Sequence, residues 1–176
     1  MTTRTPAFSF SELRQGWLDI RLEDGDKVCD FSVASVFSEP LRDLCDALVD
    51  AHDAMNGGVP PYHFEFEWLG EGWIYFWKLQ PEGDVIKVHA SFAGSRIVGD
   101  CPSMVWKLDT VFDRNAFARE IWSMGGEILS KHGLVGYRQL WGRDFPLAQL
   151  LGLREIIEDT PMTGWDSELK ALTALA

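Results

Sequence analysis

Three side chains that could bind a metal or transfer protons occur at every second position near the middle of the chain. His63, Glu65 and Glu67 alternate with aromatic residues, so in a β-strand they project from one face. Together with His89 from a neighbouring strand, they could ligate a metal ion or act as a general acid and base. The same alternation is typical of the solvent-facing side of a strand, which is the interpretation we adopt.

Other reactive residue types lack the partners that catalysis needs. The three cysteines, Cys29, Cys45 and Cys101, are odd in number and have no metal-ligand spacing, which indicates buried thiols in a reducing compartment. The chain contains no glycine-rich phosphate loop, nucleophile elbow, HExxH or CxxC motif. The sequence therefore predicts no catalytic residue, no metal site and no cofactor, and favours binding over catalysis.

Five carboxylates form the sharpest charged feature of the sequence. At 100° per residue they fall within about 80° of one side of a predicted helix, where Arg42 is the only basic side chain from Glu39 to Gly58. We call these residues the acidic stripe: Glu39, Asp43, Asp46, Asp50 and Asp53. Each like-charge pair three or four residues apart destabilises a helix by roughly 0.2–0.5 kcal/mol. Either the stripe is a solvated face, or it docks on a partner protein with a basic surface.

The net charge of −11 is unevenly distributed. Residues 1–88 carry 16 acidic and 7 basic side chains, a net of −9, whereas residues 89–176 carry 11 and 9, a net of −2. Direct binding of nucleic acid needs clustered Lys and Arg, so this balance argues against it. The start of the chain lacks a secretory signal and no stretch is long and apolar enough to span a bilayer, so we expect no membrane contact and a cytoplasmic location.

The first elements that position these residues are a hairpin and a helix. WLDIRLE (17–23) and KVCDFSVAS (27–35) alternate around Asp24-Gly25, a strong two-residue turn signal. Centred on that dipeptide, the turn sets Ile20 against Cys29 and places Asp19 opposite Asp30. A helix follows, capped by Ser38 and closed by residues 56–58.

An aromatic meander comes next, built from residues 62–68, 73–77 and 85–92. The middle strand belongs to GWIYFW and is apolar on both faces, as expected for a central strand covered on each side. We therefore predict that Trp73, Tyr75 and Trp77 face the core; the alternative is a partly exposed platform for a ligand.

The remaining chain predicts one strand and further helices. MVWKLDTVF (104–112) is a strand, Asp113 caps a helix that reaches about His132, and helices at the periphery follow. The fold class is thus α+β: an antiparallel sheet of five or six strands, from the N-terminal hairpin and the aromatic meander, packed with two main helices and peripheral C-terminal helices. We expect one domain over 1–176, with 1–12 and 160–176 peripheral.

The order of these elements resembles a group of small bacterial proteins that includes immunity proteins of polymorphic toxin systems. The similarity covers roughly residues 16–155. It rests on the segment SVASVFSEPLRDLCDALVDA, the aromatic meander and the segment HGLVGYRQLWGRDFPLAQLLGLR. It is a pattern of spacing and supplies no catalytic residue. It implies a cytoplasmic protein that binds and blocks one cognate toxin.

The sequence leaves three functions open. The favoured one is a protein-binding module that docks on a basic protein, such as a toxin, through the acidic stripe. The first alternative is a small-molecule-binding domain or enzyme that uses the aromatic meander and the face of His63, Glu65 and Glu67. The second alternative is a structural homo-oligomer.

Overall fold

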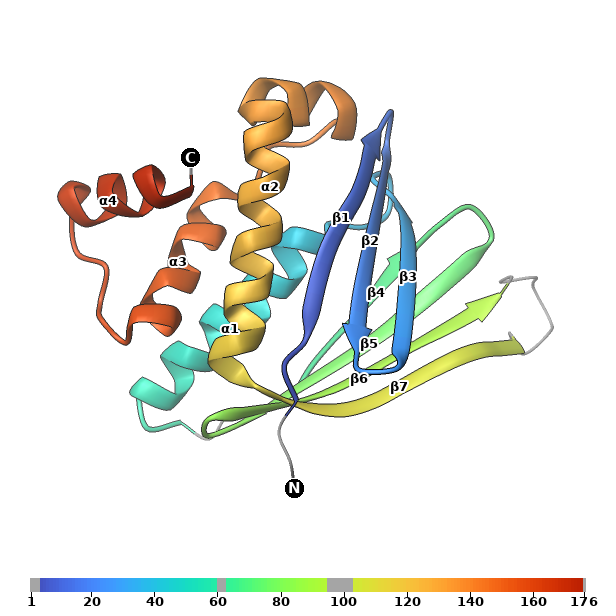
Figure 1. Cartoon of the computed structure of the whole chain (residues 1–176), viewed down its shortest axis with the longest axis horizontal. Coiled ribbons are helices and arrows are strands. Elements are labelled where there is room, and N and C mark those ends of the chain that lie inside the picture. Colours follow the sequence, from blue (N-terminus) through green and yellow to red (C-terminus); the bar gives the residue numbers. More distant parts are fainter. Residues whose placement is uncertain (1–3, 60–62, 95–102, 176) are drawn as a thin grey trace.

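The computed structural model describes residues 4–59, 63–94 and 103–175, and over these ranges the chain is α+β (Figure 1). The predicted class is confirmed, but the seven strands of the described residues form two antiparallel sheets instead of one sheet of five or six. The elements in chain order are β1 (Ala7–Arg14), β2 (Trp17–Asp24), β3 (Lys27–Ala34), α1 (Pro40–Asn56), β4 (Phe64–Leu69), β5 (Trp73–Glu82), β6 (Val85–Gly94), β7 (Ser103–Asp113), α2 (Arg114–Trp141), α3 (Leu147–Glu158) and α4 (Trp165–Leu175).

The smaller sheet has the strand order β1-β2-β3, and its β2–β3 hairpin differs from the predicted register by two residues. Gly25, with φ of 58°, begins the turn, so Ile20 pairs with Phe31 and not with Cys29. Glycine at the first central position suits a hairpin turn. The shift sets Arg21 opposite Asp30 at 2.7 Å, where the predicted register had two aspartates facing each other.

Strand β1 was not predicted, although its alternation of Phe8 and Phe10 is visible in the sequence. Both side chains are buried, and Phe8 contacts Phe117 of α2 edge-on with ring centroids 5.3 Å apart. The backbone N–H of Phe8 donates to the carboxylate of Glu120, which satisfies part of the outer edge of β1. This strand thus joins the hairpin to the core and lies against α2.

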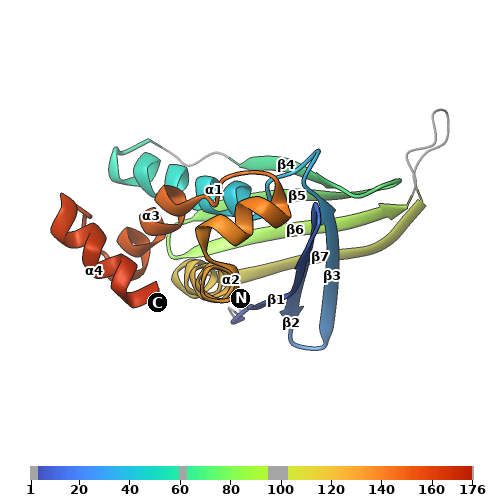
Figure 2. The same ribbon diagram turned by 90° about the horizontal axis from the view of Figure 1, so that it is seen from above.

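The larger sheet has the order β4-β5-β6-β7 and separates two chemically different faces. On the inner face, Phe31 of β3 packs on Trp77, Trp68 and Trp106 with centroid distances of 5.0–5.3 Å. Tyr75 and Trp77 are buried there, as the core interpretation of GWIYFW predicted. The outer face carries alternating polar residues and lies opposite the helices and most of the smaller sheet, of which only the β2–β3 turn approaches it, beside β7 (Figures 1 and 2).

The helices gather at one end of the larger sheet (Figure 2). Asp113 caps α2 as predicted, since its side chain accepts from the N–H of Ala116. Gly133, with φ of 64°, interrupts α2 where the helix was expected to end, and a second helical segment continues to Trp141. Gly125 lies so close to Leu150 of α3 that a Cβ would approach that side chain to 2.7 Å, which explains a glycine inside a helix.

Candidate functional site

The first residue of the acidic stripe is bound within the chain. Glu39 is the N-cap of α1, and its side chain is only 18% exposed. Arg143, after the end of α2, donates to the Glu39 carboxylate at 2.9 Å, and Arg42 lies 3.6 Å from it. The predicted cap Ser38 accepts instead from the N–H of Leu69, at 2.8 Å. Glu39 and Ser38 therefore fix the start of α1 to other elements.

Asp43 is bound in a second way, by an indole from the larger sheet. The Nε1–H of Trp68 donates to Asp43 Oδ2 at 3.0 Å, and Trp68 itself is fully buried. Burial raises the pKa of Asp43 from 3.8 to about 6, and the bond from Trp68 opposes this shift. Asp43 is therefore a partly desolvated carboxyl that joins α1 to β4.

The remaining three carboxylates form the open half of the stripe. Asp50 and Asp53 are exposed, whereas Asp46 is half-buried, and burial raises the pKa of Asp46 above its ordinary value. Across the described ranges, none of these three side chains has a hydrogen-bond or ion-pair partner. The last turns of α1 extend past the start of β4 (Figures 1 and 2). The structure therefore separates the five predicted residues into a bound pair and an open trio.

An apolar pair that sequence reasoning missed lies just before α1. Val36 and Phe37 are 71% and 58% exposed. Arg143 holds this segment, because its guanidinium donates to the backbone oxygens of Ser35 at 3.0 Å and Val36 at 3.3 Å. An exposed aromatic side chain near charged groups is typical of protein interfaces. The adjacent VF dipeptide was the sequence signal, but the predicted loop gave no reason to expect it outside the core.

The aromatic and polar groups of the alternative site lie on opposite faces of the larger sheet. Tyr75 and Trp77 face inward, whereas Glu65 faces outward and pairs with Lys78 at 2.9 Å and His63 at 3.4 Å. Trp77 lines one hollow together with Glu65, Glu67 and His89, but neither Trp73 nor Tyr75 lines a cavity with them in the described part of the chain. The sheet therefore separates Trp73 and Tyr75 from the polar groups of this alternative and leaves only Trp77 in a hollow with them.

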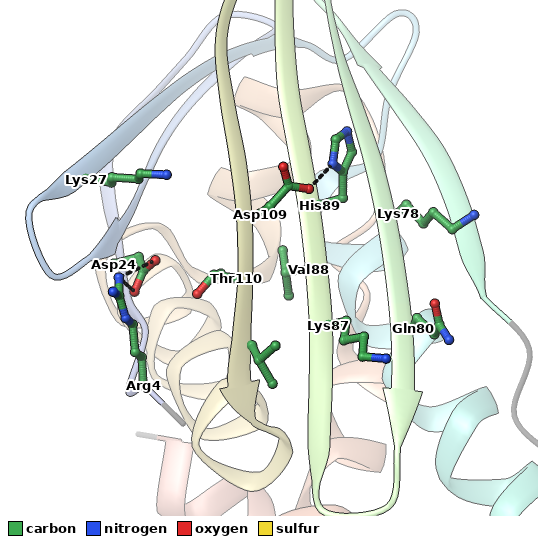
Figure 3. A pocket seen from close by; sticks show the side chains of 11 residues that line it. Arg4, Asp24, Lys27, Lys78, Gln80, Lys87, Val88, His89, Asp109 and Thr110 are labelled. Atoms are coloured by element: carbon green, nitrogen blue, oxygen red, sulfur yellow. Dashed lines mark hydrogen bonds and ion pairs between the residues drawn. The ribbon is translucent and has the colours of Figure 1, made fainter. Parts of the chain in front are cut away.

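The outer face of the larger sheet holds two neighbouring hollows that share Lys78 and His89. One hollow is lined by three lysines and has a volume of about 460 Å³. It lies between this face and the tip of the β2–β3 hairpin (Figure 3). His89 Nδ1 lies 2.6 Å from an oxygen of Asp109, and this contact lowers the pKa of Asp109. Sequence reasoning found His89 but not the lysines around it.

Within the described residues, the cysteines and histidines form no recognisable reactive group. Cys29 and Cys45 are buried free thiols, and desolvation raises the pKa of Cys29 to about 11 and that of Cys45 well above its ordinary value. Cys101 lies outside the described residues. Among residues 4–59, 63–94 and 103–175, no three His, Cys, Asp or Glu side chains are placed to hold a metal ion. The helices of these ranges are all too short or too polar to cross a membrane.

Comparisons with known proteins give little guidance. No family model and no curated protein matches the chain. Among solved structures it is similar to a chain of the CdiA-CT/CdiI toxin and immunity complex from Enterobacter cloacae, with a TM-score of 0.36 and 10% identity, over 69% of this chain and 98% of that chain. A similarity this low does not establish a common fold.

Proposed function

We propose that this protein is a binding module for a basic protein, which docks on the open half of the acidic stripe. The observation that carries the proposal is that Asp46, Asp50 and Asp53 lack an ion-pair partner in the described chain. Their mutual repulsion destabilises α1, and the two nearest its C-terminus also oppose the helix dipole. A positively charged partner surface relieves both costs.

The apolar pair Val36 and Phe37 extends this docking surface. Interfaces combine an aromatic or aliphatic centre, where water is excluded, with a charged rim that selects the partner. Arg143 fixes the apolar pair and the Glu39 end of α1 together, so the two features keep one relative position. The partner surface that fits is therefore an apolar recess flanked by Lys and Arg.

The finer form of the proposal follows from the resemblance of the chain to immunity proteins of polymorphic toxin systems. In that form the partner is the basic domain of one cognate toxin, and binding blocks its nucleic-acid site. A toxin that acts on nucleic acid needs clustered cations, which are the groups that an acidic stripe covers. The protein then acts by occlusion and requires no catalytic residue of its own.

Carbodiimide cross-linking in the native host tests the proposal, because this reagent joins a carboxylate to a contacting lysine without a spacer. We expect Asp46, Asp50 or Asp53 to be joined to lysines of one basic protein. With that protein purified, Asp46→Lys/Asp50→Lys should lower the association rate by about tenfold or more at low salt and flatten its salt dependence.

The control is Glu127→Lys on the exposed side of α2, which reverses one negative charge outside the stripe, half of the charge change in the double variant. This variant should keep the wild-type association rate within about twofold. Cross-links confined to other faces, or equal rates for both charge-reversed proteins, would refute a docking role for the stripe. Phe37→Ser should raise the dissociation rate while leaving the salt dependence unchanged.

A further inference from the structure

The lysines of the chain are concentrated on and beside the outer face of the larger sheet, where each of the three on the sheet contacts a carboxylate. Of the six lysines in the sequence, three project from this face and a fourth lies at the hairpin tip beside it: Lys78, Lys87, Lys107 and Lys27. Three of them line the 460 Å³ cavity together with His89 and Gln80 (Figure 3). The chain has a net charge of −11, so this is an unusual concentration of cations.

The strand register sets the spacing of these groups. Lys78 pairs with His89, and Gln80 pairs with Lys87, so the four side chains occupy two adjacent cross-strand rows. Neighbouring strands are about 4.8 Å apart, and successive residues on one face are about 7 Å apart. Four side chains that donate hydrogen bonds thus occupy the corners of a small rectangle on a rigid sheet.

Two of these donors already converge on one anionic oxygen. Lys87 Nζ and Gln80 Nε2 both donate to Oε1 of Glu82, at 2.6 and 2.8 Å. Both members of the Lys87–Glu82 pair are about half exposed, so the pair contributes little to stability. A ligand with more negative charge than Glu82 can therefore replace this carboxylate at small cost.

The hairpin tip supplies a further cation. Lys27 extends from β3 toward β7 (Figure 3) and has no ion-pair partner anywhere in the described ranges. Its neighbour Asp24 is buried and neutralised by Arg4, with both carboxylate oxygens 3.1 Å from the guanidinium. Asp109, the other acid in the lining, contacts His89 and Lys107. Lys78 pairs with Glu65 at 2.9 Å, so Lys27 is the lysine of the lining that lacks an ion-pair partner among the described residues.

We infer that this cavity binds a compact oxyanion with two or more negative charges, of the phosphate or polycarboxylate class. The oxyanion lies between Lys27, Lys87 and His89 and replaces Glu82 as the acceptor for Lys87 and Gln80. This site is independent of the docking surface on α1.

Titration of the whole protein with pyrophosphate and with citrate, followed by amide NMR at low ionic strength, tests the inference. We expect saturable shifts confined to β5–β7 and the β2–β3 turn, with a Kd of about 1 mM or tighter for one probe. Tighter binding of pyrophosphate assigns the phosphate class, and tighter binding of citrate assigns the polycarboxylate class. Absence of saturable shifts with both probes overturns the inference.

Variants that are expected to change the oxyanion affinity in opposite directions distinguish a specific site from general attraction to a face that carries lysines. Lys27→Gln and Lys87→Gln should each weaken binding about fivefold, and Glu82→Gln should strengthen it, because the internal competitor is removed. Lys170→Gln on α4 is the matched control and should leave the Kd within about twofold. Equal weakening by Lys87→Gln and Lys170→Gln, or no gain in Glu82→Gln, would show that the cavity is not the site.

Discussion

The two halves of the acidic stripe share one helix face and one sign of charge but differ in their surroundings. Glu39 and Asp43 at the start of α1 contact Arg143 and Trp68 from elements distant in sequence. Asp50 and Asp53 near the end of α1 contact no side chain of the described chain through a hydrogen bond or ion pair. Charge patterning along a helix therefore shows where carboxylates point, but not which of them the fold itself uses.

The cause of the difference is where α1 lies relative to its neighbours. Its first turns lie beside the end of β4 and the segment after α2, which bring an indole and a guanidinium to the stripe. Its last turns extend past the start of β4 (Figures 1 and 2). The bound half should thus affect stability, and the open half should affect recognition.

The largest expected effect tests the bound half at Arg143. Arg143→Ala removes hydrogen bonds to two backbone oxygens and to the largely buried Glu39 carboxylate. We expect the free energy of unfolding to fall by about 1–2 kcal/mol, measured by urea denaturation. The control is Arg138→Ala, which breaks an ion pair with Asp144 in which both side chains are exposed. This substitution should lower the free energy of unfolding by less than about 0.5 kcal/mol. Equal losses would mean that the two halves of the stripe do not differ in this way.

The position of α1 and its apolar side was predictable, because Leu41, Leu44, Cys45 and Leu48 repeat with a helical period and are all buried. The partners of Glu39 and Asp43 were not. Arg143 is 104 residues from Glu39, and Trp68 is 25 residues from Asp43. Such contacts depend on how elements pack, which the pattern of a single element does not contain.

The hairpin shows a similar limit at shorter range. The alternation of β2 and β3 correctly placed Phe31 and Cys29 on the buried face, because a shift of two residues preserves the face. The register itself depended on whether Asp24 or Gly25 begins the turn, and the pairing of Arg21 with Asp30 favours the observed choice. Strand β1 was missed because only two alternating phenylalanines mark it.

A middle-sized effect tests the desolvation of Asp43 through its pH dependence. Since the pKa of Asp43 is raised from 3.8 to about 6, the folded state holds this proton more tightly than the unfolded state. The stabilisation from protonation is complete below pH 3.8 and is lost as the pH rises through 6. Asp43→Asn keeps an acceptor for Trp68 and removes the carboxylate, so its advantage over wild type should grow between pH 4 and 7.

That advantage should reach about 1 kcal/mol at pH 7.5, because Asp43 is only partly exposed and its charged form is poorly hydrated. Urea denaturation at several pH values measures the difference between the variant and wild type. Asp53→Asn at the exposed end is the control for removing one carboxylate from the same helix face. A flat difference for Asp43→Asn would contradict the burial of this carboxyl.

The smallest effect on stability tests the open half. Asp50→Lys/Asp53→Lys replaces the repulsion between Asp46 and Asp50 by attraction and places cations near the C-terminus of α1, so the free energy of unfolding should rise by a few tenths of a kcal/mol. The gain should shrink at about 0.5 M salt, where exposed charges are screened.

The same reversal at Asp43 should destabilise the protein, because it breaks the bond from Trp68. If Asp50 and Asp53 bind a basic partner, the double variant will be more stable than wild type but will associate with that partner more slowly. A loss of stability at the open end would instead assign these two carboxylates to the fold, as with Glu39 and Asp43.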